Sequence, residues 1–292
     1  MLTITKVHSA SKARSYYTAD TPGGQQAASE WQGELTLDWN LSGAVVGAVE
    51  LERALNGWTP DSQDPLLSHR MPNRISAIDC TFKAPKSISI AAIANGDQEL
   101  LVAHREAVSV ACGSIERDSQ TKVKRQQRSF WQDTGVLAIA KFEHTLSRLN
   151  DPHLHTHCIA INATKHQDRY MAWCSRNLFK KIKHYGAIYR DALVERVQAL
   201  GHRLRDAAKG WELASVPDAL IRQFSKRQAQ IDKHVGHAAT MRDREIASVI
   251  TRPRKQEKNL DDLRRGWNLE RMSVLQNEIA QTLSKDSGSV RN

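Results

Sequence analysis

The chain has 292 residues, 40% of them hydrophobic, so it can bury the core of one large domain or of two small ones. Lys and Arg number 42 against 32 Asp and Glu, and the resulting net charge of +10 favours a polyanionic partner. The sequence contains no apolar run of 18 residues, lipidation motif or basic amphipathic anchor, so no membrane insertion is expected and nucleic acid is the favoured polyanion.

Sequence signals for export and for nucleotide hydrolysis are missing. Polar residues follow the first seven residues too soon for a signal peptide, so a cytoplasmic location is expected. No Gly-x-x-x-x-Gly-Lys-Ser/Thr loop is present, so this chain is not expected to hydrolyse nucleoside triphosphates. The cysteines lack a Cys-x-x-Cys spacing, as is typical of buried thiols in a reducing compartment. They are Cys80, Cys112, Cys158 and Cys174.

Strand and helix signals alternate in the amino-terminal half. Apolar residues alternate over 2–7, which predicts an opening strand. The elements expected after it are a helix-compatible segment over 9–17, a Gly/Gln/Ala/Ser-rich loop over 18–29, a helix over 45–55 ended by Asn56-Gly57, a loop over 59–72, a strand over 75–82, and two helices over 87–94 and 98–116 separated by Asn95-Gly96.

A hairpin in the middle of the chain is predicted to bring histidines together. Residues 135–145 and 154–162 are rich in apolar and β-branched residues and flank a turn-like Asn-Asp-Pro, which predicts two antiparallel strands. Alternate residues of a strand share a face, so His155 and His157 point the same way, and His144 on the partner strand can meet them.

The carboxyl-terminal half is predicted to be mostly helical and basic. The expected elements are a polar basic arm with Lys122, Lys124, Arg125 and Arg128 before the hairpin, a strand over 170–174, a helix over 177–200 stopped by Gly201, short strands over 202–205 and 211–213, and helices from Pro217 with breaks at Gly236 and Pro253. Residues 221–258 hold ten Lys or Arg and four acids. Such a run is often a solvated helical face, but with a polyanionic partner we favour a cationic flap that neutralises phosphates.

Three neutral imidazoles can hold a divalent cation and leave a position for a substrate oxygen. One His-x-His pair would be a weak signal, because a surface histidine is usually solvated. The third histidine on the neighbouring strand makes a metal site the favoured interpretation. His153 has the same parity but lies at the turn, and is taken as a bystander. Imidazoles suit Mn, Ni, Co or Zn better than Mg.

Tyr16 and Tyr17 are the candidate nucleophiles, since they are adjacent in a chain that has five tyrosines. Adjacent aromatics are more often packing residues, and a phenol with a pKa near 10 needs a base or a cation to react at neutral pH. Asp79 lies in an apolar strand segment, where a carboxylate must be paired. It either bonds a backbone amide at a strand end, orients a ligating histidine or accepts the tyrosine proton.

Several motifs, taken together and in order, resemble the relaxase domain of MobF-class (TraI/TrwC-type) conjugative plasmid relaxases over nearly the whole chain. The motifs are the opening strand followed by Tyr16-Tyr17, Ser29-Glu30-Trp31-Gln32-Gly33, Asp79-Cys80-Thr81-Phe82-Lys83-Ala84-Pro85-Lys86-Ser87, His144 with Asp151-Pro152-His153-Leu154-His155-Thr156-His157, Phe224-Ser225-Lys226-Arg227 and Thr251-Arg252-Pro253-Arg254-Lys255. The resemblance implies one relaxase domain over 1–292, of which about 221–292 is a helical basic flap.

The resemblance also implies a fold and an activity. The fold is α+β, with an HUH-endonuclease-like antiparallel sheet palm flanked by helices and a helical flap over single-stranded DNA. The activity is strand-specific nicking and strand transfer at a plasmid transfer origin, through a 5′-phosphotyrosine link. By position, Tyr16 matches the nucleophile and Tyr17 its neighbour, Asp79 matches the acidic residue, and the metal ligands match His144, His155 and His157.

The implied cofactor is a divalent metal ion, Mg or Mn in use, with Zn, Ni or Co as alternatives. The implied partners are single-stranded plasmid DNA, accessory DNA-processing proteins and secretion-coupling proteins, in the cytoplasm of a bacterium and with a monomeric enzyme. Basic residues near the site and in the flap are expected to contact phosphates, although each alone is more often an ordinary surface charge. They are Lys86, Arg148, Lys226, Arg227, Arg252 and Lys255.

Two departures from the family pattern are visible. Family members carry a second tyrosine pair after the first, whereas residues 18–29 contain no tyrosine, and they continue into a helicase, for which this chain has no motif. Two alternatives stay open: a rolling-circle-type replication initiator, and a non-catalytic basic metal- or DNA-binding module. In such initiators the nucleophile usually follows the histidines, and here the tyrosine pair precedes them, which favours the relaxase.

Overall fold

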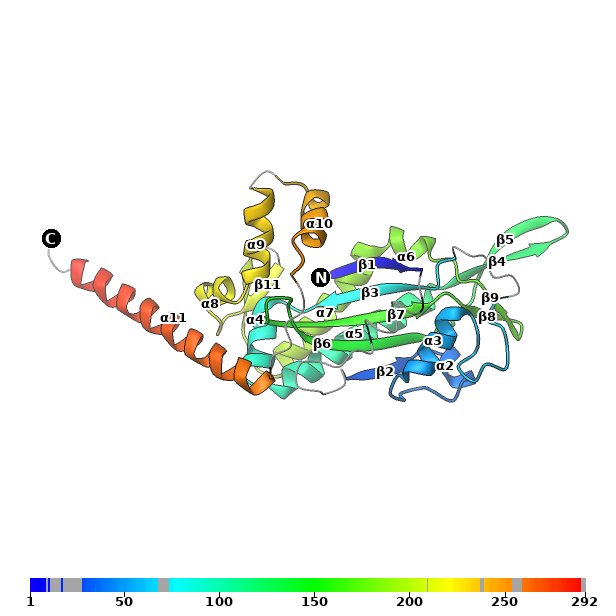
Figure 1. The fold of residues 1–292 in the computed structure, drawn as a ribbon, viewed down its shortest axis with the longest axis horizontal. Helices are drawn as coiled ribbons and strands as arrows, with labels where there is room; N and C mark the ends of the chain where they lie inside the picture. Colours follow the sequence, from blue (N-terminus) through cyan, green and yellow to red (C-terminus); the bar gives the residue numbers. More distant parts are fainter. Residues whose placement is uncertain are drawn as a thin grey trace.

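A five-stranded antiparallel sheet forms the centre of the computed structural model, which describes residues 1–8, 10, 17, 28–67, 74–208, 210–236, 239–253 and 259–289. The strand order is β1-β3-β7-β6-β2 (Figure 1). The strands are β1 (Leu2–Val7), β2 (Ser29–Gln32), β3 (Ala77–Lys83), β6 (Ile139–Leu146) and β7 (Pro152–Ile161). Each neighbouring pair is antiparallel, and the predicted α+β fold is confirmed.

The two faces of the central strand β7 carry different chemistry. Leu154 and Cys158, at even positions, join the core formed with α5 (Gln98–Arg117) and α7 (Ile182–Ala199). Ile159 and Ile161, at odd positions, join a second core with Trp31. Because side chains alternate along a strand, the odd face continues from these apolar residues into histidines toward the beginning of β7.

Helices in the amino-terminal half largely follow the sequence signals. They are α2 (Leu35–Asp38), α3 (Ala48–Asn56), α4 (Lys86–Ser89), a π-helical stretch η1 (Ile90–Ala94) and α5. Gly57 ends α3 in the left-handed region with φ of 85°, which confirms the predicted stop. The helix begins three residues later than predicted because Gly47 is extended. Strand β2 and helix α2 were not predicted, and the segment predicted as a helix over 9–17 lies, apart from Ala10 and Tyr17, outside the described residues.

The basic arm predicted before the histidine hairpin is itself a hairpin, of β4 (Gln120–Arg125) and β5 (Arg128–Asp133). Gln126 and Gln127 form its turn with φ of 47° and 63°, as in the two-residue turns that match strand twist. Glutamine is an unusual residue in such a turn, which is why the sequence did not reveal it. The hairpin extends away from the body of the molecule (Figure 1).

The carboxyl-terminal elements are short strands followed by helices. They are β8 (Thr164–His166), β9 (Arg169–Met171), α6 (Arg176–Lys180), α7, β10 (Leu204–Ala207), β11 (Gly210–Leu213), α8 (Asp218–Gln223), α9 (Lys226–Val235), α10 (Met241–Ile250) and α11 (Leu260–Ser289). The helix predicted over 177–200 is divided at Lys181. We call α9, α10 and α11 the flap; α9 and α10 stand beside one end of the sheet and α11 projects outward (Figure 1). Within the described ranges, no helix is both long and apolar enough to span a membrane.

Candidate active site

Strands β6 and β7 form the hairpin that the sequence predicted, and it carries three facing histidines. His144 of β6 lies directly opposite His155 of β7, with a register shift just after His144. The turn between the strands, residues 147–151, is closed by a hydrogen bond from the Ser147 amide to the Asp151 carbonyl at 2.9 Å. We call His144, His155 and His157 the histidine triad and residues 147–151 the histidine turn.

The histidine triad has the dimensions of a metal site. Ring centroids lie 5.4 Å apart for His144 and His155, 5.2 Å for His144 and His157, and 5.3 Å for His155 and His157. Imidazole nitrogens about 2.1 Å from a tetrahedral metal place ring centroids about 5.2 Å apart. As the side chains lie in the described ranges, no group of three or more His, Cys, Asp or Glu converges closely enough to hold a metal ion. Because the ring centroids already have the spacing of a metal site, the three imidazoles would need to rotate, without movement of the strands, to bind an ion.

Hydrogen bonds at Nδ1 set which ring nitrogens are available. The Nδ1 atom of His155 lies 2.8 Å from the His153 carbonyl, and that of His157 lies 2.8 Å from Asp79 Oδ2. A carbonyl and a carboxylate only accept, so in both rings Nδ1 carries the proton and Nε2 has the lone pair. Burial, followed by the neighbouring histidines, lowers the pKa of His155 well below its usual value. Burial thus favours the neutral form of the His155 imidazole, which is the form that binds a divalent cation.

Asp79 connects the histidine triad to the amino-terminal tyrosines. Its side chain is buried, and Oδ2 accepts both the His157 Nδ1 proton and the Tyr17 hydroxyl, each at 2.8 Å. The Thr81 hydroxyl donates to Oδ1 at 3.0 Å and lies 3.1 Å from His157 Nδ1. The contact with His157 fits a carboxylate that orients a histidine, and the contact with Tyr17 fits a carboxylate that receives a tyrosine proton. Sequence reasoning missed Thr81, although its parity with Asp79 on β3 places both on one face.

Tyr17 is buried beside His157 and is held there by its hydrogen bond to Asp79. Its side chain is 6% exposed, and its ring lies 5.3 Å from His157 and 5.6 Å from Phe142. The hydroxyl donates to the carboxylate oxygen that also binds Nδ1 of His157, so Tyr17 lies on the Nδ1 side of that ring and leaves Nε2 to a ligand. Tyr16 lies outside the described residues. The structure thus places Tyr17 in the network that supports a predicted ligand.

Replacing Asp79 with Asn is expected to lower divalent metal affinity about 10- to 100-fold, because His157 loses the carboxylate that fixes its tautomer and orientation. Calorimetric titration with Mn²⁺ would measure the change. The matched control is Asp38→Asn, since Asp38 is bound by Lys165 on another part of the surface. Equal Mn²⁺ affinity in the Asp79 variant and the parent protein would contradict the assignment of Asp79 to ligand orientation.

The predicted phosphate-binding residues divide into two groups. Burial first, then the positive charges of Arg252 and Arg148, lower the pKa of Arg227, and we call these three residues the arginine cluster. Arg227 also donates to the Ser248 carbonyl at 2.7 Å and the Thr251 carbonyl at 2.9 Å, which ties α9 to α10. Arg148 belongs to the histidine turn, whereas Arg227 and Arg252 come from α9 and from just after the end of α10, 79 and 104 residues later in the sequence.

The two lysines have protein partners. Lys86 donates to the Pro152 carbonyl at 2.8 Å, and burial lowers its pKa to about 8. Lys226 pairs with Glu270 of α11 at 2.9 Å. Both therefore help to hold the structure around the histidine turn. Lys255 lies outside the described residues.

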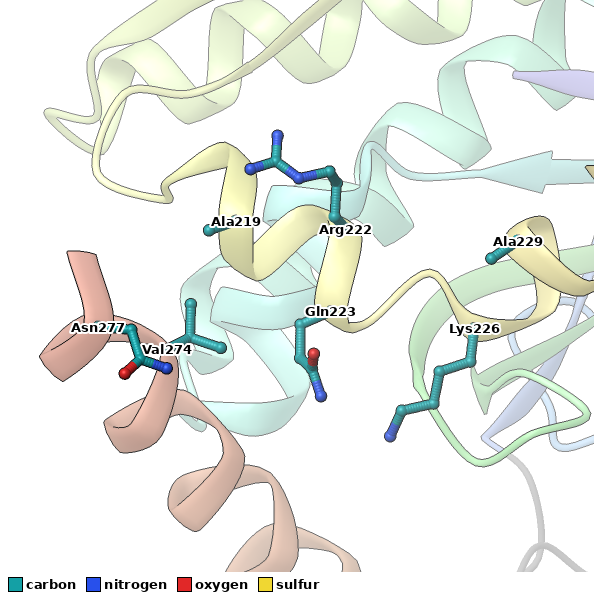
Figure 2. Close-up of a pocket in the computed structure, with 7 residues that line it drawn as sticks. All are labelled: Ala219, Arg222, Gln223, Lys226, Ala229, Val274 and Asn277. Atoms are coloured by element: carbon teal, nitrogen blue, oxygen red, sulfur yellow. The ribbon is translucent and has the colours of Figure 1, made fainter. Parts of the chain in front are cut away.

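Two open depressions lie away from the histidine triad. The first, of about 540 Å³, lies among α8, α9 and α11, where Gln223 and Lys226 extend to the same side and Arg222 points away (Figure 2). The second, of about 840 Å³, is on the β4–β5 hairpin and is lined by Arg125, Arg128 and Phe130 among others.

Comparison with known sequences identifies related proteins. Residues 4–274 match the family model described as TrwC relaxase. The multifunctional conjugation protein TraI of Escherichia coli strain K12 is 34% identical over 271 residues, which cover 88% of this chain and 15% of that protein. A second Escherichia coli TraI is 33% identical over 270 residues. The chain spans about 15% of the length of these curated relatives.

Solved structures of similar proteins contain DNA. A metal-bound structure of conjugative relaxase TrwC in complex with oriT DNA has a TM-score of 0.84 and 31% identity, over 91% of this chain and 96% of that chain. A copper-bound complex of TrwC with oriT DNA has a TM-score of 0.85 and 30% identity, over 94% and 98%. TrwC complexed with a 27-mer DNA comprising the recognition hairpin and the cleavage site has a TM-score of 0.84 and 30% identity, over the same shares.

Proposed function

Because this chain belongs to the TrwC relaxase family, we propose that it is a metal-dependent relaxase that nicks and transfers one DNA strand at a plasmid transfer origin. The observation that carries the proposal is the histidine triad, supported from behind by Asp79 and Tyr17. Relatives with at least 30% identity were solved with oriT DNA, one of them metal-bound and one copper-bound. Family membership favours the relaxase over a rolling-circle initiator and over a non-catalytic module.

We assign the cation to His144, His155 and His157, and leave its identity among Mg, Mn, Zn, Ni and Co. A divalent ion bound there supplies positive charge for the non-bridging oxygens of the scissile phosphate. Asp79 keeps Nε2 of His157 free of a proton and aimed away from the carboxylate. The Thr81 and Tyr17 hydroxyls donate to the same carboxylate, and these hydrogen bonds hold Asp79 in place.

We assign the nucleophile to Tyr16, because the hydroxyl of Tyr17 donates to Asp79. The Tyr16 oxygen forms a bond to phosphorus while the bond from phosphorus to the 3′-oxygen breaks. The phenol loses one proton and the leaving 3′-oxygen gains one, so the step consumes and releases no proton overall. One phosphodiester is exchanged for another, so the step can run backwards and rejoin the strand. The lack of tyrosine over 18–29 assigns any second cleavage to Tyr17 or to another copy of the enzyme.

DNA contact is assigned to two surfaces. Single-stranded DNA next to the cleavage site would run over the surface where the histidine turn and the flap meet, and the arginine cluster there would neutralise phosphates. The β4–β5 hairpin carries Lys122, Lys124, Arg125 and Arg128, and a two-stranded ribbon has the width of a DNA major groove. A relative binds DNA that comprises a recognition hairpin together with a cleavage site, and this ribbon suits the duplex part of such DNA.

A monomeric enzyme acting in the bacterial cytoplasm would hand the nicked strand to accessory DNA-processing and secretion-coupling proteins. The size of the basic excess suits a nucleic-acid substrate, with 42 basic against 32 acidic residues. We propose that the domain over 1–292 carries the nicking step, and that the flap from about 221 onward covers the single strand.

Incubation with a labelled transfer-origin oligonucleotide and Mn²⁺ or Mg²⁺ tests the proposal. The expected result is a covalent protein–DNA species that survives denaturing electrophoresis, with a free 3′-hydroxyl on the released fragment. Omission of metal or addition of a chelator should prevent it. Binding of the oligonucleotide without an adduct, in the presence of each metal, would support the non-catalytic module instead.

Arg252→Ala is expected to weaken single-stranded DNA binding and to reduce the slope of log affinity against log salt by about 0.7, the value for one phosphate contact on a single strand. Fluorescence anisotropy between low and moderate salt would measure both quantities. Lys165→Ala removes one positive charge from β8, far from the flap, and serves as the control. A slope that falls equally in both variants would mean that total charge, rather than the arginine cluster, governs binding.

A further inference from the structure

The histidine turn is a docking point for the flap. The Lys226 amide at the start of α9 donates to Asp151 Oδ2 at 3.0 Å, and the Trp267 Nε1 of α11 donates to the Asn150 carbonyl at 3.1 Å. Trp267 is 3% exposed and Asp151 is 1% exposed, so both contacts are shielded from water. Two flap helices are thus attached to the short turn that begins the ligand-bearing strand β7.

Helix α9 receives its cap from that turn. Ser225, its own N-cap residue, makes no side-chain cap bond, and its hydroxyl donates to the Ile221 carbonyl at 2.6 Å. The first amides of a helix have no partner within the helix, and a carboxylate there also meets the positive end of the helix dipole. Asp151, 75 residues earlier in the chain, fills this role for Lys226. A local cap has been replaced by one from the histidine turn.

The surroundings of Asp151 point to a positional role. Its Oδ1 is buried without a hydrogen-bond donor, and lies 3.7 Å from the Lys226 ammonium, which Glu270 of α11 also binds. Burial raises the pKa of Asp151 to about 6, despite the positive charges of Lys86 and Lys226. A solvent-facing Ser or Asp would cap α9 without this desolvation cost. What the buried carboxylate adds is a fixed distance between α9 and β7.

We propose that Asp151 is a positioning residue that clamps α9 to the histidine hairpin, and that it thereby couples DNA binding by the flap to metal binding by the histidine triad. Asp151 lies four residues before His155 on one side of the clamp, and Arg227 of the arginine cluster follows Lys226 on the other. The clamp rests on contacts in the structure, and its functional consequence rests on the proposed function. Coupling between two sites is reciprocal, so DNA raises metal affinity by the factor by which metal raises DNA affinity.

Hydrogen exchange on the protein without metal or DNA tests the clamp by itself. In Asp151→Ala, the amides at the start of α9 should exchange about fivefold faster, as expected for the loss of a typical N-cap. Asp151→Asn keeps an acceptor oxygen and should return exchange to within about twofold of the parent protein. Amides of α5 provide an internal reference. Unchanged α9 exchange in Asp151→Ala would overturn the clamp.

Thermodynamic linkage tests the coupling. Mn²⁺ affinity is measured by calorimetry with and without an origin oligonucleotide, in a Tyr16→Phe background that prevents cleavage. DNA should raise Mn²⁺ affinity about fivefold or more in this parent, less than about twofold after Asp151→Ala, and by the parental factor again after Asp151→Asn. Asp97→Ala, which removes the side-chain cap of α5, is the matched control and should keep the parental factor.

The outcomes separate the clamp from the proposed function. The coupling would be overturned if DNA left the Mn²⁺ affinity of the Tyr16→Phe parent unchanged. It would also be overturned if DNA raised the Mn²⁺ affinity of the Asp151→Ala variant by as much as that of the parent. An equal loss in Asp97→Ala would assign the effect to general destabilisation and would overturn the specific role of Asp151. A parent protein that binds neither Mn²⁺ nor DNA would overturn the proposed function, while the exchange experiment would still decide whether Asp151 clamps α9.

Discussion

Tyr16→Phe should lower the rate of covalent adduct formation by at least about 10⁴-fold while single-stranded DNA binding survives. Loss of a nucleophile removes the chemical step itself, and effects of this size are typical when a covalent catalyst loses its attacking atom. Binding should survive because the phosphate contacts assigned to the arginine cluster do not involve the phenol. Single-turnover reactions resolved on denaturing gels would give the rate, and anisotropy would give the affinity.

Tyr17→Phe is the matched control for this prediction, since it removes one hydroxyl from the neighbouring residue. The Tyr17 hydroxyl donates to Asp79, which keeps His157 and Thr81 as partners after the substitution. A hydrogen bond to a charged group contributes about 1.5–3 kcal/mol, so we expect a loss of about 10- to 100-fold in rate. The reverse pattern, with a normal rate for Tyr16→Phe and no adduct for Tyr17→Phe, would reassign the nucleophile to Tyr17.

His155→Ala should lower metal affinity by at least about 100-fold and reduce adduct formation in parallel. The His155 ring lies 5.4 Å from that of His144 and 5.3 Å from that of His157, and the two imidazoles that remain hold a divalent cation poorly. Mn²⁺ titration and single-turnover cleavage, measured on the same preparation, would show whether the two losses agree. Excess Mn²⁺ should restore part of the activity, because the nucleophile is intact.

His153→Gln is the control for the metal prediction. The His153 ring lies 4.7 Å from His155, yet the support it gives is its backbone carbonyl, which the substitution retains. Metal affinity should therefore stay within about twofold of the parent value. A loss as large as that of His155→Ala would make His153 a ligand and would refute its interpretation as a bystander. Unchanged affinity in His155→Ala would remove His155 from the ligand set.

Much of the palm could be predicted because its signals are local. Alternating apolar residues on both sides of a turn gave the β6–β7 hairpin, and parity alone placed His155 and His157 on one face. Partners of the site that are distant in sequence were not predictable. Thr81 reaches His157 across 76 residues and Tyr17 reaches Asp79 across 62. Such contacts depend on the strand order of the sheet, which no local pattern specifies.

The positions of basic residues in the sequence did not indicate which groups they contact in the structure. Lys226 was predicted to bind DNA because it lies in a basic run. In the structure its ammonium pairs with Glu270 and its backbone amide donates to Asp151. The basic arm before the hairpin was predicted without strands because its turn residues, Gln126 and Gln127, are not the usual Asn-Gly. The family resemblance supplied the roles of the tyrosines and histidines, which local patterns alone left among several alternatives.

The three imidazoles come from one short hairpin, whereas the acid that orients His157 is 78 residues away on β3. Hairpins of this kind form in about 1–10 μs, long before distant strands pair. We therefore expect a newly made chain to bind whichever divalent cation it meets first, with little discrimination. Selectivity would arrive only as β3 docks, so the ion recovered from purified protein should vary with the growth medium.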